Sequence, residues 1–536
     1  MIPELLLQLP QLPQLPQLPQ LPQLPLPIAA NAVTDGIGVV LQWDTLLYIG
    51  LGMLVGMLVG AFPGVTATMA VALASGFTLT MDPIQGLAVL LTIYVAAQFG
   101  DRVPAILINT PGTPASIATT FDGYPLAKQG KAGLAMTASA FGSAFGMIIG
   151  IIVLSLFAIP LAGLARQFGP PEMFALVVFG LTMMIGVSSG RIFKGLVAGA
   201  FGLLLATVGR DPITGDQRFT LDILELNGGV PFIPVIIGLF GVAEVLNQMV
   251  THRRNAVQDK PISQLGQWMP DRAMFRRLIK PMGIGAGTGS VVGLVPAVGG
   301  DIAGIIAWDN AKRFSKRKEE FGKGSIEGLT SADTSSTATL GGSVTTTMAL
   351  GVPGDSVMAV LIGSMMIWGI QPGPALFTND PSLVYTLATI LLVATVLSLG
   401  LSLVRMKSMV KLLELKNQYL WIIILVFCMV GTYSISNSVF DVFVMLIMGL
   451  IGLFMLRFGF PAGPAVLGLI LGPLAESNLR RTLIGDGWTG FLTSPIALVL
   501  FAISAAALLL PPLRQMRLRR KQALKDKDEG LSVLIP

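Results

Sequence analysis

The chain has 536 residues, of which 53% are hydrophobic and only 12% are charged, whereas an average soluble domain is about 25% charged. So few charged residues cannot cover a soluble globule of this size, and cations in loops beside membrane spans account for the net charge of +6 better than nucleic-acid binding does. The composition excludes a soluble protein and predicts a membrane protein that binds no nucleic acid.

The first 27 residues contain a Leu-Pro-Gln repeat. Proline at every third residue forbids an α-helix and favours an extended polyproline II conformation. The segment does not fit a cleavable signal peptide, since no Lys or Arg precedes Arg102 to form a basic n-region. We expect residues 1–39 to be a disordered extension without a function of its own, and the missing cations favour an external N-terminus.

Apolar runs recur from Leu46 to Pro511 and suit membrane-spanning helices of about 20 residues each. They lack the alternation of apolar and polar residues that membrane β-strands show. The expected fold class is therefore all-α, a polytopic helical membrane protein. We expect a first transmembrane repeat at 40–251, a basic cytoplasmic linker at 252–280, a second transmembrane repeat at 281–511 and a basic cytoplasmic tail at 512–536.

The two apolar halves resemble each other, which indicates an internal repeat. Glycines spaced four residues apart precede a proline in each half: Gly52, Gly56, Gly60 and Pro63 in the first, and Gly285, Gly289, Gly293 and Pro296 in the second. Glycines at this spacing form a flat stripe on a helix, and we expect them to serve helix packing rather than ligand contact. Each half later contains a Pro-Gly turn, at Pro111-Gly112 and at Pro353-Gly354.

A Pro-Gly turn at membrane depth interrupts a helix and frees several backbone N–H and C=O groups. Lipid cannot satisfy these groups, so broken backbone is tolerated only where it is buried in protein or lines a watery cavity. Two broken segments at corresponding positions of two halves indicate the binding site of a secondary transporter. The freed N–H groups suit a carboxylate, and the freed carbonyls suit a sodium ion.

Substrate is expected between the segments Asn109 to Ser116 and Ser335 to Ser356, where hydroxyl and amide groups can complete a ligand shell without burying a full charge. The candidate substrate-binding residues are Asn109, Thr110, Pro111, Gly112, Thr113, Ser116, Arg102, Ser335, Ser336, Thr337, Pro353, Gly354 and Ser356. The candidate cation-binding residues are Gly64, Thr66 and Asp355.

Charged residues inside apolar segments are candidates for function because their burial in a membrane is costly. Arg102 either pairs with its neighbour Asp101 or anchors a substrate carboxylate. Asp355 either binds sodium or lies at the membrane surface. The segment Asp122 to Pro125 is expected to form a turn that shapes a loop. Three further carboxylates are expected at solvated helix ends rather than as proton carriers: Asp301, Asp309 and Glu244.

An enzyme is one alternative, since Gly186-Val187-Ser188-Ser189-Gly190 matches the nucleophile pattern Gly-x-Ser-x-Gly. No strand pattern precedes this serine, and the only histidine, His252, lies in a distant cationic connection, so the match predicts no active site. The sequence motifs of P-loop ATPases and zinc proteases are missing. The single cysteine, Cys428, allows no intramolecular disulfide. We expect no enzymatic activity, no cofactor and no transition metal.

Four long segments stand in a recognisable order. They are AILINTPGTPASIATTFDGYPLAKQGKAGLA within Phe99 to Gly142, GLLLATVGRDPITGDQRFT at Gly202 to Thr220, FGKGSIEGLTSAD at Phe321 to Asp333, and LGVPGDSVMAVLIGSMMIWGIQPGPALF at Leu350 to Phe377. Over residues 40–510 the chain resembles the large membrane subunit, the permease, of the tripartite tricarboxylate transporters.

The resemblance implies a multi-pass permease of the bacterial inner membrane that imports a di- or tricarboxylate such as citrate. It implies coupling to a cation gradient, with sodium favoured over the proton, and two halves that are inverted relative to each other. It also implies two partners, a small four-helix membrane subunit and a periplasmic solute-binding protein that delivers the substrate. Self-association is left open. A channel-like or scaffold membrane protein without coupled transport is the alternative.

The chain departs from the family pattern at several positions. Where the family has Gly-Ser after an aromatic-Gly pair, this chain has Asp101-Arg102. Where the family has Pro-Glu-Ala-Ala-Asn-Asn, this chain has the residues from Ala332 to Thr337. The Pro-Gly of another turn is Pro296-Ala297, and a Ser after the last Pro-Gly is Asp355. We expect the fold to survive these departures and the chemistry of the site to change.

Overall fold

The computed structural model describes residues 26–187, 192–211, 214–252, 262, 266–374, 376, 380, 382–404 and 417–509. Regular structure in these residues is almost entirely helical, apart from the antiparallel strands β1 (Gly209–Arg210) and β2 (Gln217–Arg218). The all-α membrane fold is confirmed. Six described helices are long and apolar enough to cross a membrane: Trp43–Ala61, Pro83–Ile108, Ala132–Ala165, Phe232–Thr251, Ser382–Val404 and Val439–Phe458.

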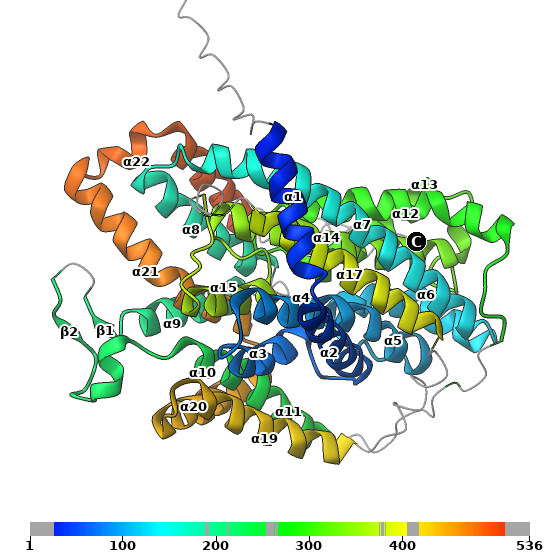
Figure 1. Ribbon diagram of the computed structural model, residues 1–536, viewed down its shortest axis with the longest axis horizontal. Coiled ribbons are helices and arrows are strands. Elements are labelled where there is room, and N and C mark those ends of the chain that lie inside the picture. The colour runs from blue at the N-terminus through cyan, green and yellow to red at the C-terminus, as the bar shows by residue number, and fades with distance from the viewer. Residues whose placement is uncertain are drawn as a thin grey trace, which may run out of the picture.

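The first part of the chain forms helices separated by short breaks (Figure 1). In chain order these are α1 (Leu26–Val40), α2 (Trp43–Ala61), α3 (Ala67–Thr78), α4 (Pro83–Gly100), α5 (Arg102–Ile108), η2 (Pro114–Ser116), α6 (Ile117–Lys128) and α7 (Ala132–Ala165). The chain continues through α8 (Pro170–Val187), α9 (Ile192–Ala206), η3 (Leu224–Gly228), α10 (Phe232–Ile236), η4 (Ile237–Val242) and α11 (Ala243–His252).

The second part again alternates helices and breaks. Its elements are α12 (Arg272–Gly293), α13 (Gly299–Phe314), η5 (Lys318–Glu320), α14 (Ile326–Leu350), α15 (Ser356–Ile367), α17 (Ser382–Val404), α19 (Asn417–Ser436), α20 (Val439–Phe458), α21 (Ala462–Gly485) and α22 (Thr489–Thr493). A further apolar helix covers Pro495–Leu509.

Each half contains two helix pairs joined by a break: α2–α3 and α5–α6 in the first half, and α12–α13 and α14–α15 in the second. The breaks lie at 62–66, 109–113, 294–298 and 351–355, and all four have the same length when the second is counted up to the short helix η2, which leads directly into α6. The sequence similarity of the halves therefore coincides with a similar order of elements. The inversion of one half relative to the other stays a prediction.

The glycine stripes lie at close helix contacts, as we expected. A side chain at Gly52, Gly56 or Gly60 of α2 would overlap backbone carbonyl oxygens of α4, and one at Gly285 or Gly289 of α12 would overlap carbonyl oxygens of α14. A Cβ in these positions would force the helices apart, so glycine allows the backbones to touch. The stripes thus hold α2 against α4 and α12 against α14.

Helix α14 is buried along almost its whole length although it is rich in serine and threonine. Most of its threonine hydroxyls donate to the carbonyl oxygen four residues earlier, as Thr330 does to Ile326 at 2.7 Å. Ser331 and Ser335 donate instead to backbone carbonyl oxygens of the neighbouring α13. These polar side chains are satisfied inside the protein, where lipid could not satisfy them.

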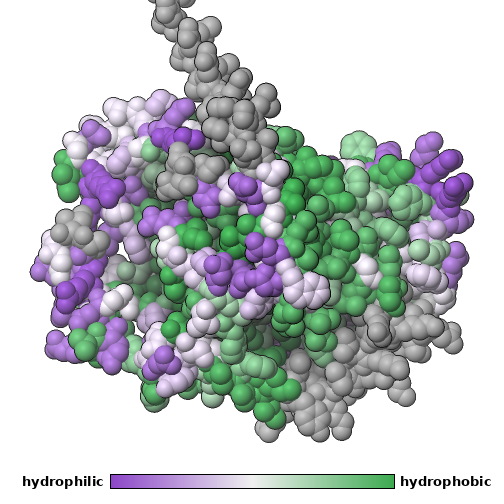
Figure 2. Space-filling model, in the orientation of Figure 1, coloured by the Kyte–Doolittle hydropathy of each residue, from purple (hydrophilic) through white to green (hydrophobic). Residues whose placement is uncertain are grey.

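The surface has the pattern of a membrane protein. Figure 2 shows hydrophilic residues at the right-hand end, near α6 and α13, and at the left-hand side, near β1, β2 and α21, with a broad hydrophobic area over α7 and α17 between them. Exposed apolar side chains of α7, such as Ile148, Ile152 and Leu156, contribute apolar surface. A continuous apolar face of this kind suits lipid rather than water.

Three expectations about local structure change. Helix α1 includes residues 26–39, which we expected to be disordered; the proline repeat ends at Pro27, so nothing prevents a helix there. Helix α12 starts at Arg272, so the basic linker ends in a helix. The segment Asp122 to Pro125 lies inside α6 rather than in a turn. Several expectations fall outside the described residues, namely those on 1–25, most of the linker, 188–190 and 512–536.

Candidate functional site

A cavity of about 260 Å³ lies where the four breaks meet. Each break lines it with residues that begin the following helix: Thr66 to Thr68 at α3, Thr113 to Ala115 before α6, Ala297 to Asp301 at α13, and Asp355 to Val357 at α15. The N-terminal ends of four helical segments, two from each half, therefore surround one space. Helix N-termini carry partial positive charge and unpaired N–H groups, which suit an anion.

Each break turns the chain with a residue in the left-handed conformation. The φ angle is +85° at Gly64, +53° at Asn109, +66° at Ala297 and +69° at Gly351. Glycine adopts this conformation without a steric penalty, whereas alanine pays one. Ala297 stands where the family pattern has glycine, so this chain keeps a strained residue in the wall of the cavity.

Side-chain caps hold two of these helix starts in place. The Thr66 hydroxyl accepts a hydrogen bond from a backbone N–H of α3 at 3.2 Å, and Asp355 Oδ1 accepts one from a backbone N–H of α15 at 2.9 Å. The hydroxyls of Thr68 and Ser356 are 2.8 Å apart and join α3 to α15. The capped helix starts bring hydroxyl and carboxylate oxygens into the cavity from both halves.

Helix α4 adds two polar side chains that the sequence analysis missed. Tyr94 and Gln98 are four residues apart, so they lie on one face of α4, and both line the cavity. Gln98 Oε1 is buried without a hydrogen-bond partner among the described residues. Such an atom is costly to bury, so this amide is available to a ligand in the cavity. The spacing of the two residues in an otherwise apolar run was the signal that could have found them.

Two carboxylates face the same cavity. Asp355 is mostly buried and receives a 2.5 Å hydrogen bond from the Tyr94 hydroxyl. Asp301, in the first turn of α13, lines the cavity and keeps accessible surface. Asp355 therefore lies inside the protein rather than at its outer surface. Asp301 is a solvated helix end, as we expected, but it also belongs to the candidate site, which we did not expect.

The other two carboxylates lie elsewhere. Asp309 is about half exposed and forms a 2.6 Å ion pair with Arg313 on α13. Glu244 of α11 accepts a hydrogen bond from Gln248 at 2.8 Å. The Gln248 side chain also lies against Gly64, where any side chain would collide with it. Neither of these carboxylates lines the cavity, and the cation candidate Gly64 does not line it either.

Four of the residues proposed from the sequence line the cavity: Thr66, Thr113, Asp355 and Ser356. Asn109 and Thr110, by contrast, are exposed at the end of α5. Gly112 and Gly354 are buried, and a side chain at either would overlap neighbouring backbone. The adjoining prolines, Pro111 and Pro353, belong to the same two breaks but not to the cavity lining.

The remaining candidates are engaged in hydrogen bonds around the cavity. Ser116 accepts a hydrogen bond from the backbone N–H of Thr113 at 3.4 Å and so closes the turn before α6. On α14, Ser335 donates to a carbonyl oxygen of α13, and Thr337 donates to the carbonyl oxygen of Asp333 at 2.5 Å. The structure therefore does not place these hydroxyls in the cavity wall.

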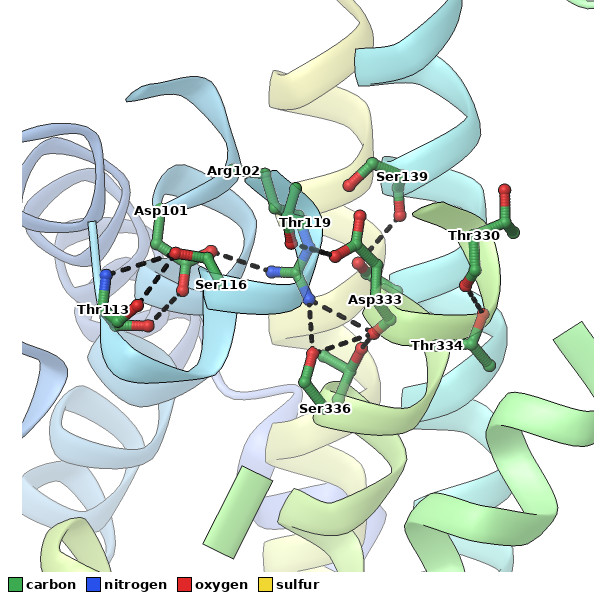
Figure 3. A network of polar contacts seen from close by, with 12 residues as sticks. Asp101, Arg102, Thr113, Ser116, Thr119, Ser139, Thr330, Asp333, Thr334 and Ser336 are labelled. Carbon is green, nitrogen blue, oxygen red and sulfur yellow. Dashed lines mark hydrogen bonds and ion pairs between the residues drawn. The ribbon is translucent and has the colours of Figure 1, made fainter. Parts of the chain in front are cut away.

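Arg102 lies in a buried network beside the cavity rather than in its lining. Figure 3 shows its guanidinium between Asp101 and Asp333: Nη1 donates to Asp101 Oδ1 at 3.1 Å, and Nε lies 3.5 Å from Asp333 Oδ1. Nη2 donates to the hydroxyl of Ser336 at 3.0 Å and to the backbone oxygen of Asp333 at 3.2 Å. The arrangement is that of the structural ion pair we considered, extended to a second carboxylate on α14.

Two threonines tie this network to its surroundings. Thr119 of α6 donates to Asp333 Oδ1 at 2.5 Å, and Thr113 donates to Asp101 Oδ2. Thr113 also lines the cavity. The buried charges are therefore one side chain away from the space between the four breaks.

A second, larger cavity of about 700 Å³ lies further along α15 and α21. Arg210 and Arg218, from the two strands, and Glu476 of α21 line it. Arg218 Nη1 is 2.7 Å from Glu476 Oε1, and Asp441 also lines the cavity, so the two arginines are matched by two carboxylates. The cavity also borders Phe232, at the start of the span that ends beside the basic linker.

The sequence model of the Tripartite tricarboxylate transporter TctA family matches residues 46–467. A protein of Agrobacterium vitis described as "Uncharacterized 52.8 kDa protein in TAR-I ttuC' 3'region" is 36% identical over 480 residues, which cover 89% of this chain and 95% of that protein. A second, "Uncharacterized protein in TAR-II ttuC' 3'region", is 33% identical over 243 residues, 45% of this chain and 100% of that protein. No solved structure matches the chain.

Proposed function

Because the chain belongs to the Tripartite tricarboxylate transporter TctA family, we propose that it is the permease subunit that imports a di- or tricarboxylate across the bacterial inner membrane, coupled to sodium. The family and the apolar helices make it a multi-pass membrane transport protein that works with other subunits. We propose four further properties: a carboxylate substrate, coupling to a sodium ion, location in the inner membrane and assembly with two partners. The partners are a small four-helix membrane subunit and a periplasmic solute-binding protein.

The observation that carries the proposal is the cavity at the four breaks. Its wall combines helix N-termini, which favour a carboxylate, with the side chains of Asp301 and Asp355, which repel one. A bound cation removes this conflict, because it is attracted both by these two side chains and by the substrate carboxylate. Each ligand therefore binds better when the other is present. Such mutual stabilisation is a coupling free energy, and it is what cotransport requires.

Sodium suits the oxygen groups that surround the cavity. The carboxylates of Asp301 and Asp355 and the hydroxyls of Thr66, Thr68 and Ser356 are hard oxygen donors contributed by three different breaks. The substrate can then use the helix N-termini and the free amide oxygen or nitrogen of Gln98. These oxygen donors come from several breaks, so they surround one ion only when the breaks lie close together. Ion binding is therefore linked to the conformation of the site.

The larger cavity offers a route from outside. It borders Phe232, where a membrane span begins, and that span ends at Thr251 beside the basic linker, which the positive-inside rule puts in the cytoplasm. The cavity therefore belongs to the opposite side, the side from which a periplasmic partner would deliver substrate.

The test is uptake of radiolabelled citrate and of a panel of other carboxylates into proteoliposomes that contain the chain with its partner subunits. We expect saturable uptake that depends on an inward sodium gradient. Asp301→Asn and Asp355→Asn should abolish the sodium dependence, whereas Asp309→Asn, a matched change at an exposed ion pair, should retain it. Unsaturable uptake that persists after collapse of the sodium and proton gradients would instead show a channel.

A further inference from the structure

The buried network around Arg102 carries more negative than positive charge. Its charged groups are one guanidinium, Arg102, and two carboxylates, Asp101 and Asp333, all at least nine-tenths buried. If both carboxylates were ionised, the group would have a net charge of −1 in a membrane interior. An uncompensated buried charge is expensive, and two carboxylates that share one site rarely both ionise.

The neighbouring elements supply no compensating cation within the described residues. Thr113 and Thr119 approach from the break before α6 and from α6 itself, and α7 and α17 bring Ser139 and Ser402 to the same region. The glycine stripes by which α2 meets α4 and α12 meets α14 carry no charge. The cation of α12 that reaches α14, Arg277, is already paired with Glu320 and Glu327. The next ionisable group is Asp301 on α13. Its negative charge acts on Asp101 and adds to the excess of negative charge in this region.

The network also has unused hydrogen-bonding capacity. The Ser139 hydroxyl is directed at the Asp333 carboxylate (Figure 3). Asp333 Oδ2 and Arg102 Nε are buried without a well-aligned hydrogen bond among the described residues. A cavity of about 20 Å³ is lined by Arg102 and Ser139. This is room for one water molecule and too little for a hydrated ion. Two side chains that contact the Asp333 carboxylate, Arg102 and Ser139, therefore border a space that is too small for a hydrated ion.

We propose that Asp101, Arg102 and Asp333 form a proton-binding site in which the two carboxylates share one exchangeable proton. A hydronium ion from the solvent transfers the proton to either carboxylate and leaves as water, and the new O–H bond brings the charge of the group to zero. No sodium ion is expected here, because the guanidinium repels it and the cavity is small.

The proton site is linked to the cavity through one side chain. Thr113 lines the cavity and donates its hydroxyl to Asp101 Oδ2, so a ligand that engages Thr113 changes the hydrogen bond that stabilises ionised Asp101. Loss of this bond favours the protonated carboxyl. Carboxylate binding should therefore be accompanied by proton uptake, a consequence that rests on the proposed function.

Infrared difference spectroscopy of the purified complex tests the site without any substrate. We expect the carbonyl stretch of a protonated carboxylic acid to disappear as the pH rises, and this band to be absent in Asp333→Asn and in Asp101→Asn, since either change leaves one carboxylate paired with Arg102. Asp441→Asn is the control, because Asp441 is also a buried carboxylate near a helix start but lies outside the network. A titrating band that both network variants retain would overturn the proposal.

Two safeguards keep the result interpretable. If Asp333→Asn does not fold, Asp101→Asn carries the same test, because it changes a residue on another helix. Proton uptake on addition of citrate is measured separately with a pH indicator in weakly buffered solution. If the wild type shows the titrating band but transports no citrate, the proton site is supported and the proposed function is contradicted. If the wild type transports citrate but shows no such band, the proposed function is supported and the proton site is contradicted.

Discussion

The hydroxyl of Tyr94 donates to Oδ2 of Asp355 at 2.5 Å. Tyr94 lies on α4 in the first half of the chain, and Asp355 caps α15 in the second half. Both line the cavity at the four breaks. This hydrogen bond fixes one oxygen of Asp355, while the other caps the backbone of α15, so the carboxylate keeps a defined orientation toward any ion that enters.

Removal of this hydroxyl should weaken binding in the cavity. In Tyr94→Phe the Asp355 carboxylate loses a buried donor, which is worth about 1–3 kcal/mol, and it becomes free to rotate. We expect the half-saturating sodium concentration for carboxylate uptake to rise by about tenfold, since about 1.4 kcal/mol corresponds to a factor of ten. Sodium-dependent uptake in proteoliposomes measures this.

Tyr433→Phe is the matched control, because Tyr433 is 45% exposed on α19 and does not line the cavity. It should behave as the wild type. An unchanged sodium dependence in Tyr94→Phe, with correct folding in detergent, would show that the Tyr94–Asp355 contact does not serve ion binding.

The glycine stripes predict that two glycine-to-alanine substitutions in the same helix have opposite effects on stability. On α2, a Cβ at Gly60 would overlap a carbonyl oxygen of α4, whereas a Cβ at Gly50 meets nothing within 4 Å. Gly60→Ala should therefore destabilise the protein by about 1–3 kcal/mol through overpacking. Gly50→Ala should stabilise it slightly because alanine favours helix. The midpoint of thermal unfolding in detergent measures both.

Helix α12 offers an independent repetition of this comparison. A side chain at Gly289 would overlap a carbonyl oxygen of α14, and one at Gly287 meets nothing. Gly289→Ala and Gly287→Ala should therefore differ in the same direction as the pair on α2. Equal midpoints for the two variants of either pair would contradict the packing role of the stripe.

The positions of proline and glycine allowed the fold to be predicted from the sequence. The residues Pro63, Pro111, Pro296 and Pro353 lie in four chain breaks, and the glycines before two of them lie at helix contacts. Proline and glycine act locally through backbone geometry, so their spacing carries this information without knowledge of tertiary contacts. The all-α membrane fold and the approximate place of the site followed from it.

The roles of individual side chains at the site were harder to predict than the fold, because they depend on which face of each helix points toward the cavity. Tyr94 and Gln98 stand in an apolar run and were overlooked, whereas Asn109 and Thr337 were proposed because they are polar and close to a break. The structure turns Asn109 outward and engages Thr337 within α14. Which face points to the cavity is set by packing between α4, α14 and their neighbours, and one chain's sequence does not reveal it.

Asn109 provides a test of its conformational rather than ligand-binding role. It is exposed and adopts φ of +53° where α5 ends, a position at which glycine is favourable and alanine is strained. Asn109→Ala should lower stability by about 1 kcal/mol, and Asn109→Gly should restore it, with normal carboxylate uptake. Reduced uptake in the stable Asn109→Gly variant would show that the amide contacts the substrate after all.

Ala297 should be replaceable by glycine with a gain in stability. It has φ of +66° in the third break, where an L-residue with a Cβ pays about 1–2 kcal/mol. Glycine relieves this strain, although part of the gain is lost to the greater entropy of the unfolded chain. We expect Ala297→Gly to raise the free energy of unfolding by about 0.5–1 kcal/mol. Thermal unfolding in detergent measures the change.

The matched control is Ala307→Gly, in the middle of α13, which should destabilise because glycine disfavours helix. A loss of stability in Ala297→Gly comparable to that in Ala307→Gly would mean that the Ala297 side chain contributes packing that outweighs its strain.

Asp122 holds the end of α6 against the segment that leads into α14. Its Oδ1 accepts backbone N–H groups of Gly322 and Ser325 at 2.8 Å each, and Oδ2 accepts the indole N–H of Trp308 at 2.6 Å. Asp122→Asn places an amide NH₂ against one of these donors. We expect it to lower stability by about 1–3 kcal/mol, measured by unfolding in detergent, while Asp309→Asn at the exposed ion pair changes stability by about 0.5 kcal/mol or less.

Because Asp122 does not line the cavity, the half-saturating carboxylate concentration should stay the same in the folded variant. A changed half-saturation with unchanged stability would make Asp122 part of the binding site and not of the scaffold that positions it.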